Sequence, residues 1–265
     1  MQDAHFAGSI PQLYERLLVP LIFEPYAIDL ARRAAELEPA RVLEIAAGTG
    51  VLTRQLAAAL PSSTAIVASD LNEPMLSHAA SIGTNRPVEW RQADAMQLPF
   101  DDESFDLVIC QFGAMFFPDK AAAFGEARRV LRGGGCFLFS VWDRIETNEF
   151  ADVVTQSLEP LFSDPPRFLA RTPHGYHDVA KIADDVRCGG FTGDPGIVTL
   201  AERSRAPGAE LPALAYCHGT PLRNEIGEAR LDEATRVTAD AIAEKFGRGE
   251  VDGKIQAHVV RAFKE

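Results

Sequence analysis

Three acidic residues recur at intervals of about 25 residues along the first 100 residues of the chain. Glu44 lies inside a short apolar segment expected to be a strand, whereas Asp70 and Asp94 follow the next two such segments. In an open parallel sheet, the carboxyl ends of neighbouring strands line the ligand crevice. The spacing therefore predicts that the three carboxylates converge on one ligand; the alternative is that one or more are solvated loop acids.

A loop of small residues, AAGTG at 46–50, connects the first strand to an Ala-rich helical segment. Gly48 and Gly50 permit backbone angles that other residues resist, and they let a ligand approach the main chain. The unpaired N–H groups at the start of the helix suit a polar or anionic ligand group. Asp70 follows Gly50 by 20 residues, a spacing suited to binding ribose hydroxyls. Glu44 is costly to bury unless a cation or a hydrogen-bond donor meets it.

The composition is that of a soluble globular protein: 265 residues, 46% hydrophobic and 24% charged, enough for one large α/β domain with additions. A net charge of -12 argues against nucleic acid as the main partner. The N-terminus lacks a secretory signal, and no apolar run approaches the roughly 20 residues that cross a bilayer. The four scattered cysteines lack zinc spacing. We expect a cytoplasmic protein without membrane insertion.

Strands and helices are expected to alternate up to residue 142, which predicts right-handed crossovers and one parallel sheet. Residues 1–10 are expected to form a loose arm, and a break at Val19-Pro20 is expected to separate two N-terminal helices. Gly133-Gly134-Gly135 is expected to end the helix before the fifth strand. The expected strands are 41–45, 64–69, 88–92, 105–110 and 136–142, with two more starting near 197 and 255.

Four motifs in register resemble those of class I S-adenosylmethionine-dependent methyltransferases, most closely the small-molecule branch that includes quinone-biosynthesis enzymes. LEIAAGTG resembles their first motif, SDLNEPML the second, and the stretches 91–119 and 126–135 the third and fourth. The match covers 41–142, and it departs from the pattern at Ala46, where glycine is usual, and at Glu44, where Asp is equally common. The resemblance implies a Rossmann-like, doubly wound, mostly parallel seven-stranded sheet with an antiparallel last strand, N-terminal helices and a helical insertion.

The resemblance also implies roles for individual residues around S-adenosyl-L-methionine, whose product would be S-adenosyl-L-homocysteine. Glu44 would lie near the ammonium group of the cofactor, and Asp70 would accept hydrogen bonds from both ribose hydroxyls. Asp94 would accept a hydrogen bond from the adenine amino group. The remaining cofactor-binding positions are the loop residues Ala46, Gly48, Thr49 and Gly50, the adenine contacts Leu71, Met75, Ala95 and Met96, and Gln111 and Phe112 at the methionine end.

By the same resemblance, residues 1–40, including Tyr14, would form a lid over a cofactor-binding core at 41–142, and 143–265 would form a C-terminal half with helical insertions. Methyl transfer needs a general base only if the acceptor must lose a proton. We assign none. Tyr14, Tyr26, His174, Tyr176 and His177 are candidates, but core or surface roles are at least as consistent with each, and His174-x-x-His177 does not indicate a metal site.

Large apolar residues after the fourth strand favour an apolar or aromatic small-molecule acceptor: Phe112, Met115, Phe116 and Phe117. Trp142, at the end of the fifth strand, could line the acceptor pocket or belong to the core. A competing hypothesis is an NAD(P)-dependent oxidoreductase, but Thr53 would occupy its third small position and Glu44 would repel a pyrophosphate. A cofactor-binding protein without activity is a third hypothesis. We expect a monomer or homodimer.

Overall fold

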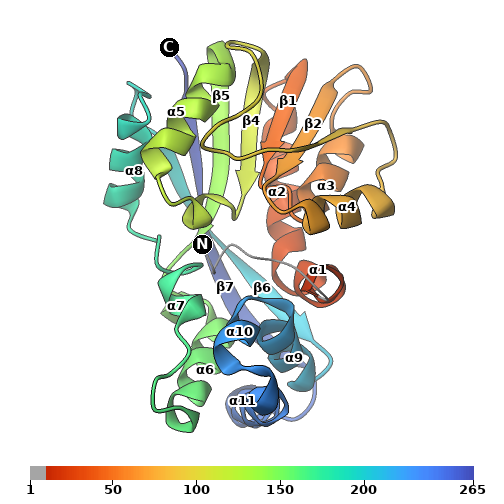
Figure 1. Ribbon diagram of the computed structural model, residues 1–265, viewed down its shortest axis with the longest axis vertical. Coiled ribbons are helices and arrows are strands. Elements are labelled where there is room, and N and C mark those ends of the chain that lie inside the picture. Colours follow the sequence, from red (N-terminus) through yellow and green to blue (C-terminus); the bar gives the residue numbers. More distant parts are fainter. Residues whose placement is uncertain (1–9) are drawn as a thin grey trace.

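The computed structural model describes residues 10–265 and contains a seven-stranded sheet (Figure 1). The five strands that were expected to be parallel do pair in parallel, and β7 runs antiparallel to both of its neighbours. The predicted fold class is therefore confirmed. In sheet order the strands are β3 (Glu89–Gln92), β2 (Ala65–Asp70), β1 (Arg41–Ile45), β4 (Phe105–Gln111), β5 (Leu131–Trp142), β7 (Val251–Phe263) and β6 (Gly196–Ala206).

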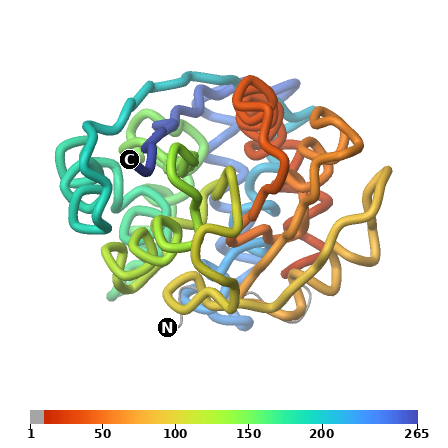
Figure 2. The backbone as a smooth tube through the Cα atoms, turned by 90° about the horizontal axis from the view of Figure 1, so that it is seen from above, coloured from red at the N-terminus to blue at the C-terminus, as the bar shows by residue number. Residues whose placement is uncertain are grey.

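Helices cover both faces of this sheet, as apolar parallel strands require. Helix α2 (Glu24–Ala35) packs against α3 (Val51–Ala59), and α5 (Lys120–Val130) packs against α8 (Val179–Cys188). Figures 1 and 2 show these two pairs on opposite sides of the sheet, with α4 (Glu73–Ile82) beside α3. The central strands are almost fully buried between the two helical layers.

The N-terminal segment corrects one expectation, because no break separates two helices at Val19-Pro20. Helix α1 (Ile10–Leu13) continues through a π-helix, η2 (Tyr14–Phe23), directly into α2. Proline has no N–H to donate and its ring clashes with the preceding turn. The wider π-helical turn, which is rare and often marks functional sites, carries Pro20 without ending the helix. The loose arm expected at 1–10 lies almost wholly outside the described residues.

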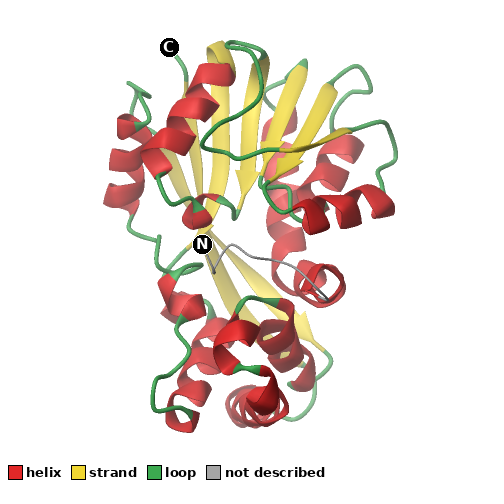
Figure 3. Cartoon of the chain, in the orientation of Figure 1, coloured by secondary structure: helices red, strands yellow, loops and turns green. Residues whose placement is uncertain are grey.

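The two last strands extend beyond the sheet and carry a second helical lobe. β6 and β7 pair over residues 196–206 and 251–261, whereas β5 reaches only residues 257–263 of β7. Figure 3 shows this two-stranded extension running into a cluster of helices below the sheet. Those helices are α6 (Glu149–Leu158), α7 (Phe168–Arg171), α9 (Glu210–Gly219), α10 (Leu222–Ile226) and α11 (Leu231–Phe246).

Two further boundaries differ from the sequence prediction. Strand β5 begins at Leu131, so the three glycines lie within the strand, near a register irregularity opposite β4, rather than at the end of a helix. The charged helix expected at 224–246 is interrupted at Gly227, which has a positive φ of 79°. No helix among residues 10–265 is both long and apolar enough to span a membrane.

Ala46 occupies a left-handed backbone conformation, with φ at 55°, which glycine adopts more readily than alanine. Gly113 makes room for its methyl group. A Cβ added at Gly113 would lie 2.4 Å from the Ala46 Cβ and 2.7 Å from the Cys110 Sγ. The loop after β1 and the loop after β4 therefore fit together only because one of the two facing residues has no side chain.

We predict that Gly113→Ala destabilises the fold by about 1–3 kcal/mol, because the added methyl overpacks this contact. Ala46→Gly should recover part of that loss in the double variant, since it removes the nearest atom. Urea unfolding of the two single variants and the double variant measures the coupling. Gly133→Ala is the control, because a Cβ there meets nothing within 4 Å. Strictly additive effects of Gly113→Ala and Ala46→Gly would contradict the predicted contact.

Candidate functional site

Two adjoining cavities lie at the carboxyl ends of β1 and β4. The smaller has an empty volume of about 280 Å³, and the larger has about 560 Å³. Tyr14 and Phe23 of η2 line both cavities and so form a shared wall. The smaller cavity is otherwise lined by Glu44, Ala46, Ala47, Gly48, Thr49, Val51, Leu52 and Gln111.

The glycine loop turns sharply because Gly48 and Gly50 both have positive φ, 57° and 84°. Gly50 also lets the loop pack closely: an added Cβ would lie 3.1 Å from Ala79 and 3.2 Å from Trp90. Two buried polar atoms on the smaller cavity's lining residues, Thr49 Oγ1 and Gln111 Oε1, have no hydrogen-bond partner among the described residues. Buried polar atoms without partners are costly, so this cavity suits a ligand with hydrogen-bonding groups.

Glu44 is 1% exposed, and its Oε2 accepts a hydrogen bond of 2.6 Å from the Thr53 hydroxyl. Burial raises the pKa of Glu44 to about 8, and the Thr53 hydrogen bond opposes that shift only in part. In the absence of a ligand cation, the carboxyl is therefore mostly protonated at neutral pH. The sequence indicated that Glu44 needs a partner; that Thr53 supplies it is visible only once β1 and α3 are packed together.

Asp70 is also buried, but its carboxylate serves the loop itself. Oδ2 accepts from the Gly48 N–H at 2.8 Å, and Oδ1 accepts from the Asn72 N–H at 2.7 Å. Burial raises the pKa of Asp70, and the backbone hydrogen bonds from Asn72 and Gly48 oppose that rise. These bonds fix the glycine loop against the end of β2. Asp70 does not line either cavity.

The predicted adenine contacts lie at the carboxyl ends of β2 and β3, outside both cavities. Leu71 is 54% exposed, and Met75 is buried with its Cε 3.7 Å from where a Gly48 Cβ would stand. Asp94 Oδ1 accepts from the Met96 N–H at 2.9 Å, and Ala95 between them is buried. Of these residues, Leu71 is exposed, Asp94 and Met96 are partly exposed, and Met75 and Ala95 are buried.

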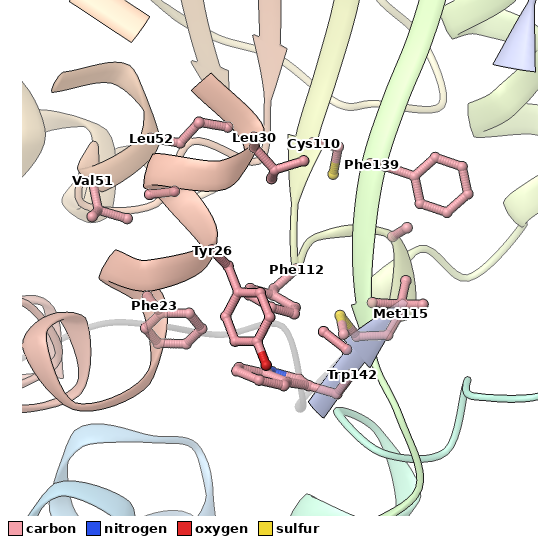
Figure 4. Packing of buried hydrophobic residues seen from close by; sticks show 14 of the residues in the cluster. Phe23, Tyr26, Leu30, Val51, Leu52, Cys110, Phe112, Met115, Phe139 and Trp142 are labelled. Carbon is pink, nitrogen blue, oxygen red and sulfur yellow. The ribbon is translucent and has the colours of Figure 1, made fainter. Parts of the chain in front are cut away.

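The end of β4 separates the two cavities. Gln111 faces the smaller one, and its Nε2 donates to the Phe23 carbonyl at 2.9 Å. Phe112 faces the larger one from a left-handed conformation, with φ at 52°, and stacks on Trp142 at 3.9 Å between centroids. Figure 4 shows Tyr26 beside this pair, and its ring is perpendicular to both. A bulky residue in this conformation is strained and is held there by packing.

An ion pair fastens η2 over the glycine loop, a contact that sequence reasoning missed. Arg54 Nη2 lies 2.5 Å from Glu15 Oε1, and Arg54 Nη1 donates to the Thr49 carbonyl at 2.8 Å. Both side chains of the pair are about three-quarters buried. One arginine therefore connects the loop at the smaller cavity to the helix that forms the shared wall.

Of the four apolar residues expected at the acceptor rim, Phe112 and Phe116 line the larger cavity, and Met115 and Phe117 do not. Trp142 both lines the cavity and packs in the core. Beyond residue 142, sequence reasoning named only His174 among the residues of this lining. It missed the others, because they are distant in the sequence and follow no motif. The full lining is Tyr14, Leu18, Ile22, Phe23, Phe112, Phe116, Trp142, Asn148, Phe168, Leu169, Pro173, His174, Tyr216 and Thr220.

Among the candidate bases, Tyr14 and His174 reach the larger cavity, whereas Tyr26, Tyr176 and His177 do not line it. The Tyr176 hydroxyl donates to Asp185, and His177 bonds the backbone oxygen of His174. Within residues 10–265, no group of three or more His, Cys, Asp or Glu side chains is placed to hold a metal ion.

Residues 43–139 match the methyltransferase domain family model. The chain is 35% identical over 133 residues to the ubiquinone/menaquinone biosynthesis C-methyltransferase UbiE of Xanthomonas oryzae, covering 48% of this chain and 49% of that protein. It is 34% identical over 168 residues to the demethylmenaquinone methyltransferase of Mycobacterium sp. strain KMS, covering 63% and 66%. The chain thus spans between half and just under two-thirds of these curated relatives.

Solved structures share the fold at low sequence identity. A Bacillus halodurans protein has a TM-score of 0.58 at 21% identity, covering 89% of this chain and 98% of its own. The [4+2]-cyclase SpnF has a TM-score of 0.56 at 17% identity, covering 91% and 80%. With these findings the resemblance inferred from the motifs is confirmed: residues 43–139 form a methyltransferase domain, in a chain that resembles class I S-adenosylmethionine-dependent methyltransferases of the quinone-biosynthesis type.

Proposed function

We propose that this protein transfers a methyl group from S-adenosyl-L-methionine to a small aromatic or apolar acceptor. The observation that carries the proposal is the pair of adjoining cavities that share Tyr14 and Phe23. One contains a glycine loop, an acid and unpartnered polar atoms, and the other is lined mostly by aromatic and aliphatic side chains. Methyl transfer needs the nucleophile, the methyl carbon and the sulfur in line, so the cofactor and the acceptor would have to meet directly where the two cavities adjoin. Proximity and orientation then supply most of the acceleration.

The residues present fit the cofactor. Glu44, Thr49 and Gln111 offer polar atoms in the smaller cavity for the methionine part, and the nucleoside would lie at the carboxyl ends of β2 and β3. When bound, the cofactor supplies a methyl group on a positively charged sulfur. Asp70, which already fixes the loop, would accept the ribose hydroxyls, and the exposed Leu71 would gain an apolar contact.

The protonation state of Glu44 depends on the charge of the ligand in the smaller cavity. A cationic ammonium close to the carboxyl favours its ionised form, whereas an empty cavity leaves it mostly neutral. A pyrophosphate would favour the neutral form and gain no attraction. Glu44 therefore supports a cationic amino-acid nucleoside over a dinucleotide, and the matching family model and the two relatives named above are described as methyltransferases.

The aromatic lining supports the acceptor class. Phe112, Phe116, Phe168 and Trp142 present large apolar surfaces to the larger cavity, and Leu18, Ile22 and Phe23 of η2 add further apolar lining. The two named relatives methylate precursors of ubiquinone or menaquinone by their descriptions, which is compatible with a ring-shaped acceptor here. The lid role of the N-terminal helices, the cytoplasmic location and the monomeric or dimeric state remain predictions from the sequence.

A protein that binds the cofactor without transferring methyl groups is the second candidate. The [4+2]-cyclase among the structural neighbours shows that this fold also occurs in a protein with another described activity. Screening aromatic acceptors for release of S-adenosyl-L-homocysteine tests methyl transfer directly. Cofactor binding without release for any acceptor would favour the second candidate.

We predict that Asp70→Ala weakens S-adenosyl-L-methionine binding by about 2–3 kcal/mol, because charge-assisted hydrogen bonds to the ribose are lost. Calorimetric titration measures the affinity. Asp106→Ala is the matched control, because Asp106 also binds backbone, at the Arg41 N–H, but at the opposite end of the sheet. It should lower stability and leave affinity unchanged. Equal affinity of Asp70→Ala and wild type would contradict the ribose role.

We predict that Glu44 contributes stability to the ligand-free protein at low pH, and that this contribution is lost as the pH rises from about 5 to 8. Its pKa is raised by folding from an ordinary value near 4.5 to about 8, so the unfolded chain releases this proton first. Glu44→Gln should remove this pH dependence, at most about 1.4 kcal/mol per pH unit. Glu244→Gln on the exposed side of α11 makes the same charge change as a control. Parallel stability curves for wild type and Glu44→Gln would contradict the shift.

A further inference from the structure

The larger cavity has few polar side chains, and two of them are occupied within the protein. Asn148 donates to backbone carbonyls and accepts from the Gln256 N–H. The Thr220 hydroxyl donates to the Tyr216 carbonyl and accepts from the Leu222 N–H. A ligand in this cavity must therefore find its polar partners elsewhere on the lining.

His174 is 5% exposed, and its tautomer follows from its surroundings. Nδ1 lies 2.9 Å from the backbone carbonyl oxygen of Asp143, which can only accept a hydrogen bond. Nδ1 therefore carries the proton of the neutral ring, and Nε2 has a lone pair. No described residue provides a hydrogen-bond partner for Nε2. Burial lowers the pKa of His174 to about 4, so the ring is neutral at physiological pH.

The imidazole is held firmly. The Asp143 side chain is fixed by the Arg144 N–H, the Gln256 side chain and His258, whose Nε2 lies 3.2 Å from Asp143 Oδ1. The carbonyl that binds His174 thus belongs to a well-anchored residue at the junction of the sheet and the second lobe. A fixed ring with a free acceptor nitrogen is suited to selecting one ligand orientation.

His174 lies close to the aromatic pair Phe112 and Trp142, which borders the smaller cavity. Its ring centroid lies 6.0 Å from that of Trp142, and Trp142 stacks on Phe112, the residue next to Gln111 of the smaller cavity. His174 Nε2 thus belongs to the same wall of the larger cavity as the Phe112–Trp142 stack, which borders the smaller cavity. A flat ligand lying against this wall would present its edge to the imidazole.

We propose that His174 is a specificity-determining residue that accepts, at Nε2, a hydrogen bond from a hydroxyl group on an aromatic methyl acceptor. That the ligand is a methyl acceptor rests on the proposed function, whereas the binding of a hydroxylated ring does not. The expected ligand is a neutral phenol-type ring system. Its apolar faces pack among the aromatic side chains, and its single hydroxyl points to the second lobe.

Equilibrium dialysis with 2-naphthol, 2-methoxynaphthalene and naphthalene at pH 7 tests the proposal. Only 2-naphthol has a hydrogen to donate, and wild type should bind it about two- to tenfold more tightly than the other two. His174→Phe should abolish that preference while keeping the affinity for naphthalene. His174→Gln, whose Oε1 can accept at a similar position, should restore part of it. His78→Phe is the control, because His78 lies on α4 and lines neither cavity.

A second readout separates ligand recognition from a structural role. The ¹⁵N resonance of His174 Nε2 should shift on saturation with 2-naphthol and stay unchanged with 2-methoxynaphthalene. An unchanged resonance, or a 2-naphthol preference that persists in His174→Phe, would overturn the proposal. If His174→Phe does not fold, the comparison of wild type with His174→Gln and the resonance decide the question.

Titration of the same proteins with S-adenosyl-L-homocysteine separates this inference from the proposed function. His174→Phe should bind it as wild type does. If wild type binds it but does not discriminate 2-naphthol, only the role of His174 fails. If wild type discriminates 2-naphthol but binds no S-adenosyl-L-homocysteine, the methyltransferase proposal fails and His174 stands as the binding residue of another site.

Discussion

The stacking of Phe112 on Trp142 joins the two halves of the site. The rings lie 3.9 Å apart and almost parallel, and they connect the ends of the neighbouring strands β4 and β5. Phe112 adopts a left-handed backbone conformation that costs energy, and the surrounding aromatic packing holds it there. Because Gln111 then faces one cavity and Phe112 faces the other, the strand end becomes a partition between them.

The loop beside this partition depends on a second set of close contacts. Ala46 keeps its left-handed conformation only opposite a residue without a side chain, Gly113. Asp70 binds the loop backbone, and Arg54 connects the loop to η2 through Glu15. The loop that lines the smaller cavity is thus held by groups from four separate parts of the chain.

Much of the fold and part of the site could be predicted from the sequence. Regular alternation of apolar strands and helices indicated the parallel sheet, and the N-terminal π-helix was missed because its sequence carries proline at a place that normally ends a helix. The glycine loop, Glu44 and Gln111 could be named from motifs, and they do line one cavity. Whether Asp70 and the predicted adenine-binding residues contact the cofactor remains a prediction.

The sequence by itself determined roughly where the strands lie along the chain and that an acid lies inside the first of them, because both depend on local patterns of apolar and polar residues. Only the tertiary structure decided which groups face that acid and which residues form the larger cavity. Thr53 meets Glu44 through helix–strand packing, and His174 and Tyr216 reach the cavity from a lobe more than 30 residues beyond the last motif. Such contacts depend on how distant segments fold together, which no local pattern records.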